Sequence, residues 1–298
     1  MLSICIPIYN FDVTELVKSI QKQIVNLQEN IEIILIDDCS TIYQTINREL
    51  KNTCIYVELP KNIGRSKIRN LFLDYAQFPY LLFLDCDSTV ISSDFIATYL
   101  IELKKGVSVA CGGRIYPEIS PSLQQKLSWK YGRESESKSA TIRNISPNSS
   151  FMTNNFLIQK DLMNLIKFEE RLTNYGHEDT LYGYELRKHH IKIIHLENPI
   201  LNGDLETNKV FLKKTELAIQ NLDLILQFIE NDVSFYNEVS LLRVYMKLKI
   251  FRSFILIFSK VYNPIIRFFL LRGIVNIHLF NLYKLCYLFS IKKAVKNF

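Results

Sequence analysis

The first hundred residues alternate between short apolar runs and stretches with helical periodicity. The apolar runs occupy residues 3–8, 31–36, 54–59 and 80–84. Residues 12–27 and 64–76, which lie between them, repeat apolar side chains at helical spacing. Continuous β-rich runs separated by helices are typical of a parallel sheet that helices cover on both faces. We therefore expect an α/β fold, in which ligands bind beyond the carboxyl ends of the strands.

Beyond residue 107 the pattern is less regular. Residues 107–115 and 151–158 indicate further strands, and residues 179–189 and 207–230 indicate helices. Residues 135–150 are polar and rich in Ser and Asn, which predicts a mobile loop. The chain has 298 residues, of which 48% are hydrophobic and 22% charged, so it can bury a full core and disorder is excluded as the default.

The cysteines favour a reduced environment. Six cysteines are scattered along the chain without a C-x-x-C pair. This distribution predicts free, mostly buried thiols in the cytosol, and it excludes a disulfide framework or a zinc site. The chain opens on an apolar strand without a basic segment before it, so we expect no signal peptide.

Acidic residues follow two of the predicted strands. Asp85 and Asp87 close the run at residues 80–84. Carboxylates one residue apart can approach one hard cation such as Mg²⁺ or Mn²⁺ and the phosphate oxygens that it bridges. Asp37 and Asp38 close the run at residues 31–36, where a carboxylate can accept hydrogen bonds from a base or ribose. Each pair alone is equally compatible with ordinary turn chemistry.

Two predicted helix starts carry charged residues. Gly64 and the basic residues of the segment 62–70 open one helix, where they can meet an anionic ligand or simply face solvent. Glu178 and Asp179 open another. A carboxylate there can act as a general base on an acceptor hydroxyl, although acids in a first turn also stabilise the helix dipole without any catalytic role.

Taken in order, these segments resemble the family 2 glycosyltransferases, which have the GT-A fold. The matching segments are residues 6–10 (IPIYN), 37–40 (DDCS), 62–70 (NIGRSKIRN), 85–87 (DCD), 153–156 (TNNF) and 175–179 (YGHED). The resemblance spans roughly residues 2–230. It implies a Rossmann-like, mostly parallel sheet flanked by helices. It also implies inverting, single-displacement transfer from a nucleoside diphosphate sugar.

The resemblance assigns roles to particular residues. It implies a catalytic base at Asp179 with Glu178 beside it, and metal ligation by Asp87 and Asp85. The implied donor-binding residues are Pro7, Tyr9, Asp38, Asn62, Arg65, Arg69 and Asp85. Of the acidic pair, Asp38 rather than Asp37 is expected to face the base of the nucleotide. The implied sugar and acceptor pocket contains Gly112, Gly113, Asn154, Asn155 and His177. The implied cofactor is Mn²⁺ or Mg²⁺.

One position departs from the family pattern. Relatives often carry a metal-binding histidine a few residues after an Asn-Pro pair, but here Asn198-Pro199 is followed by Asn202. His195 precedes that pair and is the candidate replacement. A packed histidine at the end of the strand at residues 191–196 is the alternative, so the third metal ligand stays open.

The C-terminal region has its own character. Eleven of the 36 Lys and Arg residues follow Glu238, the last acidic residue, and they are mixed with Phe, Tyr, Leu and Ile. We expect a catalytic domain at 1–235 and an amphipathic helical extension at 236–298 that lies on an anionic membrane surface. Residues 274–291 form a longer apolar run that polar residues interrupt, so spanning a bilayer stays open there but lying in the interface is favoured. A helical subdomain or an oligomer interface is the alternative.

The predicted function is transfer of a hexosyl or N-acetylhexosaminyl group to a glycan or lipid-linked hydroxyl in surface polysaccharide synthesis. UDP-sugar is the expected donor, and the expected location is the cytoplasmic face of the cell membrane. Nucleic acid is excluded as a partner because the acidic catalytic edge offers it no basic groove. A sugar nucleotidyltransferase and a non-catalytic binding module are the alternatives. The sequence does not identify the sugar, the acceptor, the linkage or the oligomeric state.

Overall fold

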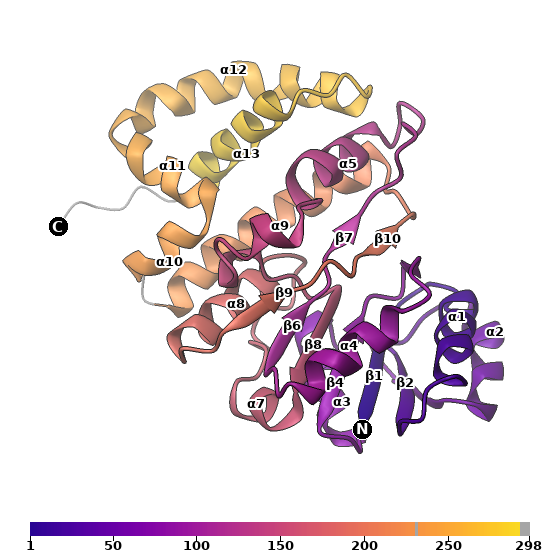
Figure 1. Cartoon of the computed structure of the whole chain (residues 1–298). Coiled ribbons are helices and arrows are strands. Elements are labelled where there is room, and N and C mark those ends of the chain that lie inside the picture. Colours follow the sequence, from indigo (N-terminus) through magenta and orange to yellow (C-terminus); the bar gives the residue numbers. More distant parts are fainter. Residues whose placement is uncertain (230–231, 293–298) are drawn as a thin grey trace. The chain divides into compact units, whose positions relative to one another are not determined.

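The computed structural model describes residues 1–229 and 232–292 in two compact units (Figure 1). Unit 1 comprises residues 1–116, 136–173 and 178–204. Unit 2 comprises residues 117–135 and 174–177 together with the chain from residue 205 onward. The functional division expected at 235/236 stays a prediction. These compact units group the chain differently, because the helix that starts at residue 208 belongs with the C-terminal helices.

A seven-stranded sheet forms the centre of unit 1. Its order is β3 (Ile55–Glu58), β2 (Ile31–Asp37), β1 (Leu2–Ile8), β4 (Tyr80–Leu84), β8 (Asn155–Gln159), β6 (Val109–Cys111) and β9 (Ile193–His195). Every neighbouring pair is parallel except those that β8 makes with β4 and β6. The predicted α/β fold with a mostly parallel sheet is confirmed.

Both faces of this sheet are buried, which explains the continuous apolar runs. Successive side chains of a strand point to opposite faces. In β2, Leu35 packs into one core cluster with helices α1 (Thr14–Ile24) and α4 (Phe95–Lys104). Ile34 and Ile36 pack into the other with α3 (Arg65–Tyr75) and α8 (Glu178–Lys188). A one-sided sheet would have required alternation of polar and apolar residues.

Unit 1 also contains a small second sheet. It orders β5 (Ser88–Val90), β10 (Ile200–Asn202) and β7 (Arg114–Ile115). The predicted strand at 107–115 is therefore split, because β6 and β7 belong to different sheets on either side of Gly112 and Gly113. The remaining helical elements are α2 (Gln44–Arg48), η1 (Glu49–Asn52), α6 (Ala140–Arg143), η3 (Asn148–Ser150) and α7 (Lys160–Leu165).

The segment expected to be a loop contains short helices. The π-helical turn Gly132–Glu136, α6 and η3 cover much of residues 135–150. Arg143 holds this segment in place, since its buried guanidinium donates to the backbone oxygens of Cys111 (3.2 Å) and Gly112 (3.0 Å). The polar composition predicted a loop, because the tertiary hydrogen bonds of Arg143 cannot be read from composition.

Unit 2 is helical in the part of it that the structure describes. It contains α5 (Lys126–Tyr131), α9 (Asn208–Phe228), α10 (Val233–Glu238), α11 (Ser240–Leu248), η4 (Lys249–Phe251), α12 (Arg252–Leu271) and α13 (Ile277–Ile291). Leu127, Leu212, Ile266, Leu270 and Phe280 form its core. The predicted C-terminal helical extension is therefore present. Within it α13 is strongly buried, with Tyr283, Leu285, Cys286, Leu288 and Phe289 all inaccessible or nearly so.

Candidate active site

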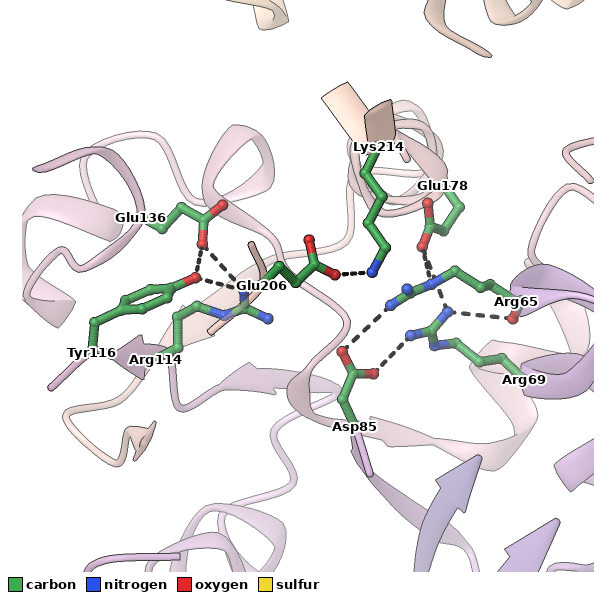
Figure 2. Close-up of polar contacts among 9 residues, drawn as sticks. All are labelled: Arg65, Arg69, Asp85, Arg114, Tyr116, Glu136, Glu178, Glu206 and Lys214. Atoms are coloured by element: carbon green, nitrogen blue, oxygen red, sulfur yellow. Dashed lines mark hydrogen bonds and ion pairs between the residues drawn. The ribbon is translucent and has the colours of Figure 1, made fainter. Parts of the chain in front are cut away.

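Two arginines on α3 connect the end of β4 to the start of α8. Arg69 Nη2 lies 3.0 Å from Asp85 Oδ1, and Arg65 Nη2 lies 3.5 Å from Asp85 Oδ2 (Figure 2). Arg65 Nε lies 2.8 Å from Glu178 Oε1, and Arg69 Nη1 lies 3.8 Å from the same oxygen. The Arg69 and Glu178 side chains are almost fully buried. Groups expected to bind the donor and to flank the base therefore form one charged cluster.

This cluster fixes the ionised state of Asp85. Burial by itself would raise the pKa of the Asp85 carboxyl, but the charges of Arg65, Arg69 and Arg114 outweigh burial and lower it. Removing one partner from such a buried network leaves an uncompensated charge, which is far more costly than losing a surface ion pair. The ionised Asp85 carboxylate therefore forms ion pairs with Arg65 and Arg69, which fixes the positions of both guanidinium groups at the end of β4.

Asp87 has the opposite environment. Burial and the nearby Asp85 charge raise the pKa of the Asp87 carboxyl, although Arg114 and Arg65 act against them. Within residues 1–229 and 232–292, Asp87 forms no ion pair. A partly buried carboxylate without a cation partner is suited to receive one, and an oxygen donor set suits Mg²⁺ or Mn²⁺. No group of three or more His, Cys, Asp or Glu side chains that could hold a metal occurs in the described part of the chain.

Asp179 has the protonation behaviour expected of a general base. Burial, followed by the charge of Glu178, raises the pKa of the Asp179 carboxyl to about 6. The backbone N–H of Thr180 donates to its Oδ1 at 2.7 Å, which helps to orient the carboxylate. A base with this pKa is ionised at neutral pH and still basic enough to take a proton. Arg65 acts to lower the pKa of both Asp179 and Asp87, so both carboxylates lie within range of its charge.

The loop after β2 is organised by Asp38. Its Oδ1 accepts from the backbone N–H of Ile63 (2.7 Å), and its Oδ2 accepts from that of Gly64 (3.1 Å). Burial raises the pKa of Asp38. Asn62 Nδ2 donates to the Asp38 backbone oxygen at 3.2 Å. Asp38 thus joins the loop after β2 to the start of α3, and this contact keeps Asn62 and Arg65 close to the end of β2.

Other donor-site candidates lie along the same edge. Asp37 is fully buried and accepts from the Ser40 backbone N–H at 2.6 Å and from Tyr56 Oη at 3.2 Å, so it supports the turn. Tyr9 directly follows β1 and is 52% exposed, which leaves its ring free to stack on a ligand. Pro7 is the second-last residue of β1 and is partly exposed.

The pocket candidates separate into two kinds. The Asn155 amide is used up inside the fold, because its Nδ2 donates to Gly113 O and Asn198 O (both 2.9 Å) and its Oδ1 accepts from Tyr99 Oη (2.6 Å). We therefore assign Asn155 a structural role. Asn154 is equally buried, yet neither atom of its amide has a hydrogen-bond partner in the described residues. Its backbone oxygen accepts from Asp85 N at 3.2 Å, so it lies beside the charged cluster.

Steric constraints explain the two glycines. A Cβ on Gly112 would lie 2.3 Å from Asn198 O, and a Cβ on Gly113 would lie 2.6 Å from Arg143 Nη2. Gly113 also has φ +87°, a conformation that other residues rarely adopt. These contacts account for both glycines through packing, whatever ligand lies near them. His177 likewise has a left-handed backbone, with φ +65°, immediately before α8.

His195 is engaged within the fold. Arg143 can only donate, so its Nη1 donates to His195 Nδ1 at 2.8 Å, and the Nε2–H then donates to Pro147 O at 2.9 Å. Burial lowers the pKa of His195 to about 4, which keeps the ring neutral. With both ring nitrogens occupied, the contacts favour the packed-histidine alternative over metal ligation by His195.

The structure adds three residues that the motifs did not single out. Arg114 in β7 donates from Nη1 to Glu136 Oε2 (3.1 Å) and Tyr116 Oη (3.0 Å), and Tyr116 donates to Glu136 (Figure 2). Arg114 Nε is buried without a hydrogen-bond partner among the described residues. The Arg114 charge acts to lower the pKa of both carboxyls, which leaves that of Asp85 lowered while burial and the Asp85 charge keep that of Asp87 raised. The sequence signal that could have identified Arg114 is its position directly after Gly112 and Gly113.

Comparison with known proteins places these residues in context. The family model described as "Glycosyl transferase family 2" matches residues 3–164. The minor teichoic acid biosynthesis protein GgaB of Bacillus subtilis is 35% identical over 100 residues, which is 31% of this chain and 11% of that protein. The match therefore spans only a small part of the curated relative.

Two solved proteins share the fold. A 1–349 fragment of TarS from S. aureus matches with a TM-score of 0.51 at 18% identity, covering 95% of this chain and 89% of that one. Its complex with UDP-GlcNAc matches with a TM-score of 0.50 at 16% identity and the same coverage. The mannosyltransferase PcManGT from Pyrobaculum calidifontis, in complex with GDP-Man and Mn²⁺, gives 0.53 at 12% identity, covering 76% of this chain and 64% of that one.

Proposed function

The chain belongs to glycosyl transferase family 2, and on that premise we propose that it transfers one sugar from a nucleoside diphosphate sugar to an acceptor hydroxyl with inversion. The observation that carries the proposal is the cluster in which Arg65 and Arg69 join Asp85 to Glu178, next to Asp179. UDP-sugar is the donor that we propose, since a related fold is known with UDP-GlcNAc. A glycan or lipid-linked acceptor of surface polysaccharide synthesis agrees with the similarity to GgaB.

The proposed reaction is a single displacement. Asp179 accepts the proton of the acceptor hydroxyl while the oxygen forms its bond to the anomeric carbon. The bond between that carbon and the diphosphate breaks on the opposite side, and the nucleoside diphosphate leaves with the electron pair. Arg65, Arg69 and Arg114 are the cations that would favour the growing negative charge on the leaving group.

A divalent cation fits the residues at this edge. Bound Mg²⁺ or Mn²⁺ would neutralise charge on the departing diphosphate, and Mg²⁺ commonly uses only one or two protein carboxylates plus phosphate oxygens. Asp87 would hold it. Asn202 of β10 pairs in register with Ser88, directly after Asp87, and its amide oxygen is the candidate for the position where relatives carry histidine. All-oxygen ligands would favour Mg²⁺ or Mn²⁺ over softer ions.

Product analysis tests the reaction class. Purified protein would be incubated with a panel of nucleotide-sugars, Mn²⁺ or Mg²⁺ and a lipid-linked glycan acceptor. We expect release of free nucleoside diphosphate with one sugar added to the acceptor. Pyrophosphate release would instead establish a nucleotidyltransferase, and saturable donor binding without turnover over a broad acceptor panel would establish a binding module.

The pH dependence of turnover should follow the charge of Asp179. We expect activity to fall as pH drops through about 6, because protonation removes the base. Glu178→Gln should move this acid limb to lower pH, since it removes a charge that raises the pKa of Asp179 and frees Arg65 and Arg69 to stabilise the ionised form. An unchanged or upward-shifted limb in kcat–pH profiles would contradict the assignment.

We also propose that unit 2 associates peripherally with an anionic membrane through α12. The segment Ser240–Leu271 is long and apolar enough to cross a membrane, and it is mostly unburied in the structure. Phe254, Ile257 and Val261 are 70%, 68% and 58% exposed, and they follow one another at helical spacing on one side of α12. An exposed apolar stripe of this kind marks a membrane or protein contact, and the exposed Lys260 and Arg272 favour anionic lipid.

The other side of α12 supports an in-plane orientation. Ser259, Ile266 and Leu270 are buried. Arg267 forms an ion pair with Glu216 of α9, which also accepts from Tyr283 of α13. A helix that crossed the bilayer would give up these contacts, whereas one lying in the interface keeps them. The sequence left open whether α13 crosses a membrane. In the structure α13 is more buried than α12.

Vesicle binding tests this surface. Replacing Phe254, Ile257 and Val261 together with serine should reduce cosedimentation with phosphatidylglycerol vesicles at least about ten-fold, because each buried apolar side chain contributes roughly 1.5–3 kcal/mol. Val25→Ser, at an 83% exposed apolar position of unit 1, is the matched control. If the triple variant binds vesicles normally but loses self-association in light scattering, the surface is an oligomer contact and the membrane proposal fails.

A further inference from the structure

A buried asparagine of α9 holds the residues that lead into α8. The Asn221 side chain is fully buried, and its Nδ2 donates to the backbone oxygens of Asn174 (3.2 Å) and Gly176 (2.6 Å). Residues 174–177 belong to unit 2 together with α9, while Glu178 and Asp179 follow immediately in unit 1. The chain segment 174–177 is therefore bound to α9 at the point where it becomes the first turn of α8.

Two more contacts come from the same face of α9. A Cβ on Gly176, which has φ +100°, would lie 2.4 Å from the Cβ of Ala218, so the segment backbone packs directly on the helix. Lys214 Nζ lies 4.8 Å from the centroid of the Tyr175 ring. Lys214, Ala218 and Asn221 are spaced four and three residues apart, which places them along one helix face. That face is shaped to receive residues 174–177.

An asparagine at position 221 is unfavourable for stability because its side chain is buried. Its helical neighbours Leu222 and Ile225 are completely buried, so an apolar side chain would suit the surroundings. The Asn221 Oδ1 atom is buried without a hydrogen-bond partner in the described residues. Desolvating an amide oxygen without a partner is unfavourable. What the amide provides in return is a fixed position for two backbone carbonyls just before the base.

We propose that Asn221 is a positioning residue for the reaction. By fixing Asn174 and Gly176, it sets the position and the burial of Asp179, three residues further on. The inference rests on the proposed role of Asp179 as general base. Donor-binding candidates of unit 1 keep partners outside this contact, since Asp38 accepts from the Ile63 backbone N–H and Arg65 also lies 3.5 Å from Asp85.

Asn221→Leu is the direct test, because leucine keeps the volume and removes the amide. We expect the turnover number to fall on the order of 10–100-fold, as for a misplaced catalytic group, with the donor KM within about two-fold of the original. The acid limb of the pH profile should also move below about 6, because a loosened Asp179 is better hydrated and burial is the main cause of its raised pKa.

Asn208→Leu provides a matched control. Asn208 is also a buried α9 asparagine, and its Nδ2 donates to the backbone oxygens of Leu123 (2.7 Å) and Leu271 (3.3 Å), away from residues 174–177. We expect it to lower thermal stability without moving the pH profile. Should Asn221→Leu behave in the same way, with activity following only the folded fraction, Asn221 is merely structural and the inference is overturned.

A second pair of variants covers the case in which Asn221→Leu does not fold. Gly176→Ala should reduce turnover because of its clash with Ala218 and its φ of +100°, and combining it with Ala218→Gly should recover the part of the loss that the clash causes. No recovery would contradict the role of this face. If instead Asp179→Asn retained full turnover, the base assignment itself would fail, so the two failures are distinguishable.

Discussion

Asp179→Asn is expected to reduce the turnover number by roughly 10²–10⁴-fold, the usual contribution of a positioned general base. The amide keeps the shape of the carboxylate but cannot accept the proton of the attacking hydroxyl. Donor binding should change little, because the variant leaves Asp85, Arg65 and Arg69 in place. Initial rates and donor affinity, measured in parallel with a saturating acceptor, separate the two effects.

The control for this variant addresses simple helix stabilisation. Asp161 lies in the first turn of α7 as Asp179 lies in the first turn of α8, so Asp161→Asn removes an equivalent helix charge. It should leave turnover unchanged. The folded-state pKa of Asp179 is raised, so its ionised form costs stability as pH rises through about 6, and Asp179→Asn should not lower the melting temperature at pH 7.5. A full-activity Asp179→Asn protein would remove the proposed base.

Asp87→Asn should abolish most metal-dependent turnover, on the order of 10³-fold, since charge neutralisation by a bound cation supplies several kcal/mol. The variant keeps an oxygen ligand but loses the negative charge that the cation requires. Calorimetric titration with Mn²⁺, in the presence of a nucleoside diphosphate, should show weaker binding. Asp94→Asn is the control, because Asp94 precedes α4 at the surface and its side chain makes no capping hydrogen bond.

The paired position on β10 sharpens the metal test. Asn202→His should shift binding toward softer divalent ions such as Co²⁺, whereas Asn202→Leu should weaken binding of Mn²⁺. Unaltered Mn²⁺ binding in both Asp87→Asn and Asn202→Leu would exclude this edge of the fold as the metal site, whatever the effect on turnover.

Local patterns were enough to predict the ends of the strands. The run at residues 80–84 ends at Asp85 in the structure as expected, because five consecutive buried side chains require a strand that is covered on both faces. The helix starts at Arg65 and Glu178 also agree with the sequence, since Gly64 and the acids of the first turn are local signals. Such features depend only on neighbouring residues and on the period of burial.

The hydrogen-bond and ion-pair partners of polar side chains could not be predicted in the same way. His195 and Asn155 carry side chains suited to a ligand, yet their polar atoms are used by Arg143, Tyr99 and backbone groups far away in sequence. Conversely, Arg114 and Glu136 meet although 22 residues separate them. Whether a polar side chain serves the fold or a ligand depends on which donors and acceptors surround it after folding, and no sequence period encodes that.

By itself the sequence determined the α/β class, the strand-end carboxylates and a basic, aromatic C-terminal region, because burial periodicity and charge distribution are properties of the local chain. Tertiary structure alone decided that Asp85 is neutralised by two arginines while Asp87 is left without a cation partner in the described residues. It also decided that α13 is buried while α12 exposes an apolar stripe. Both outcomes arise from long-range packing, which sets the desolvation and the partners of every charged or apolar group.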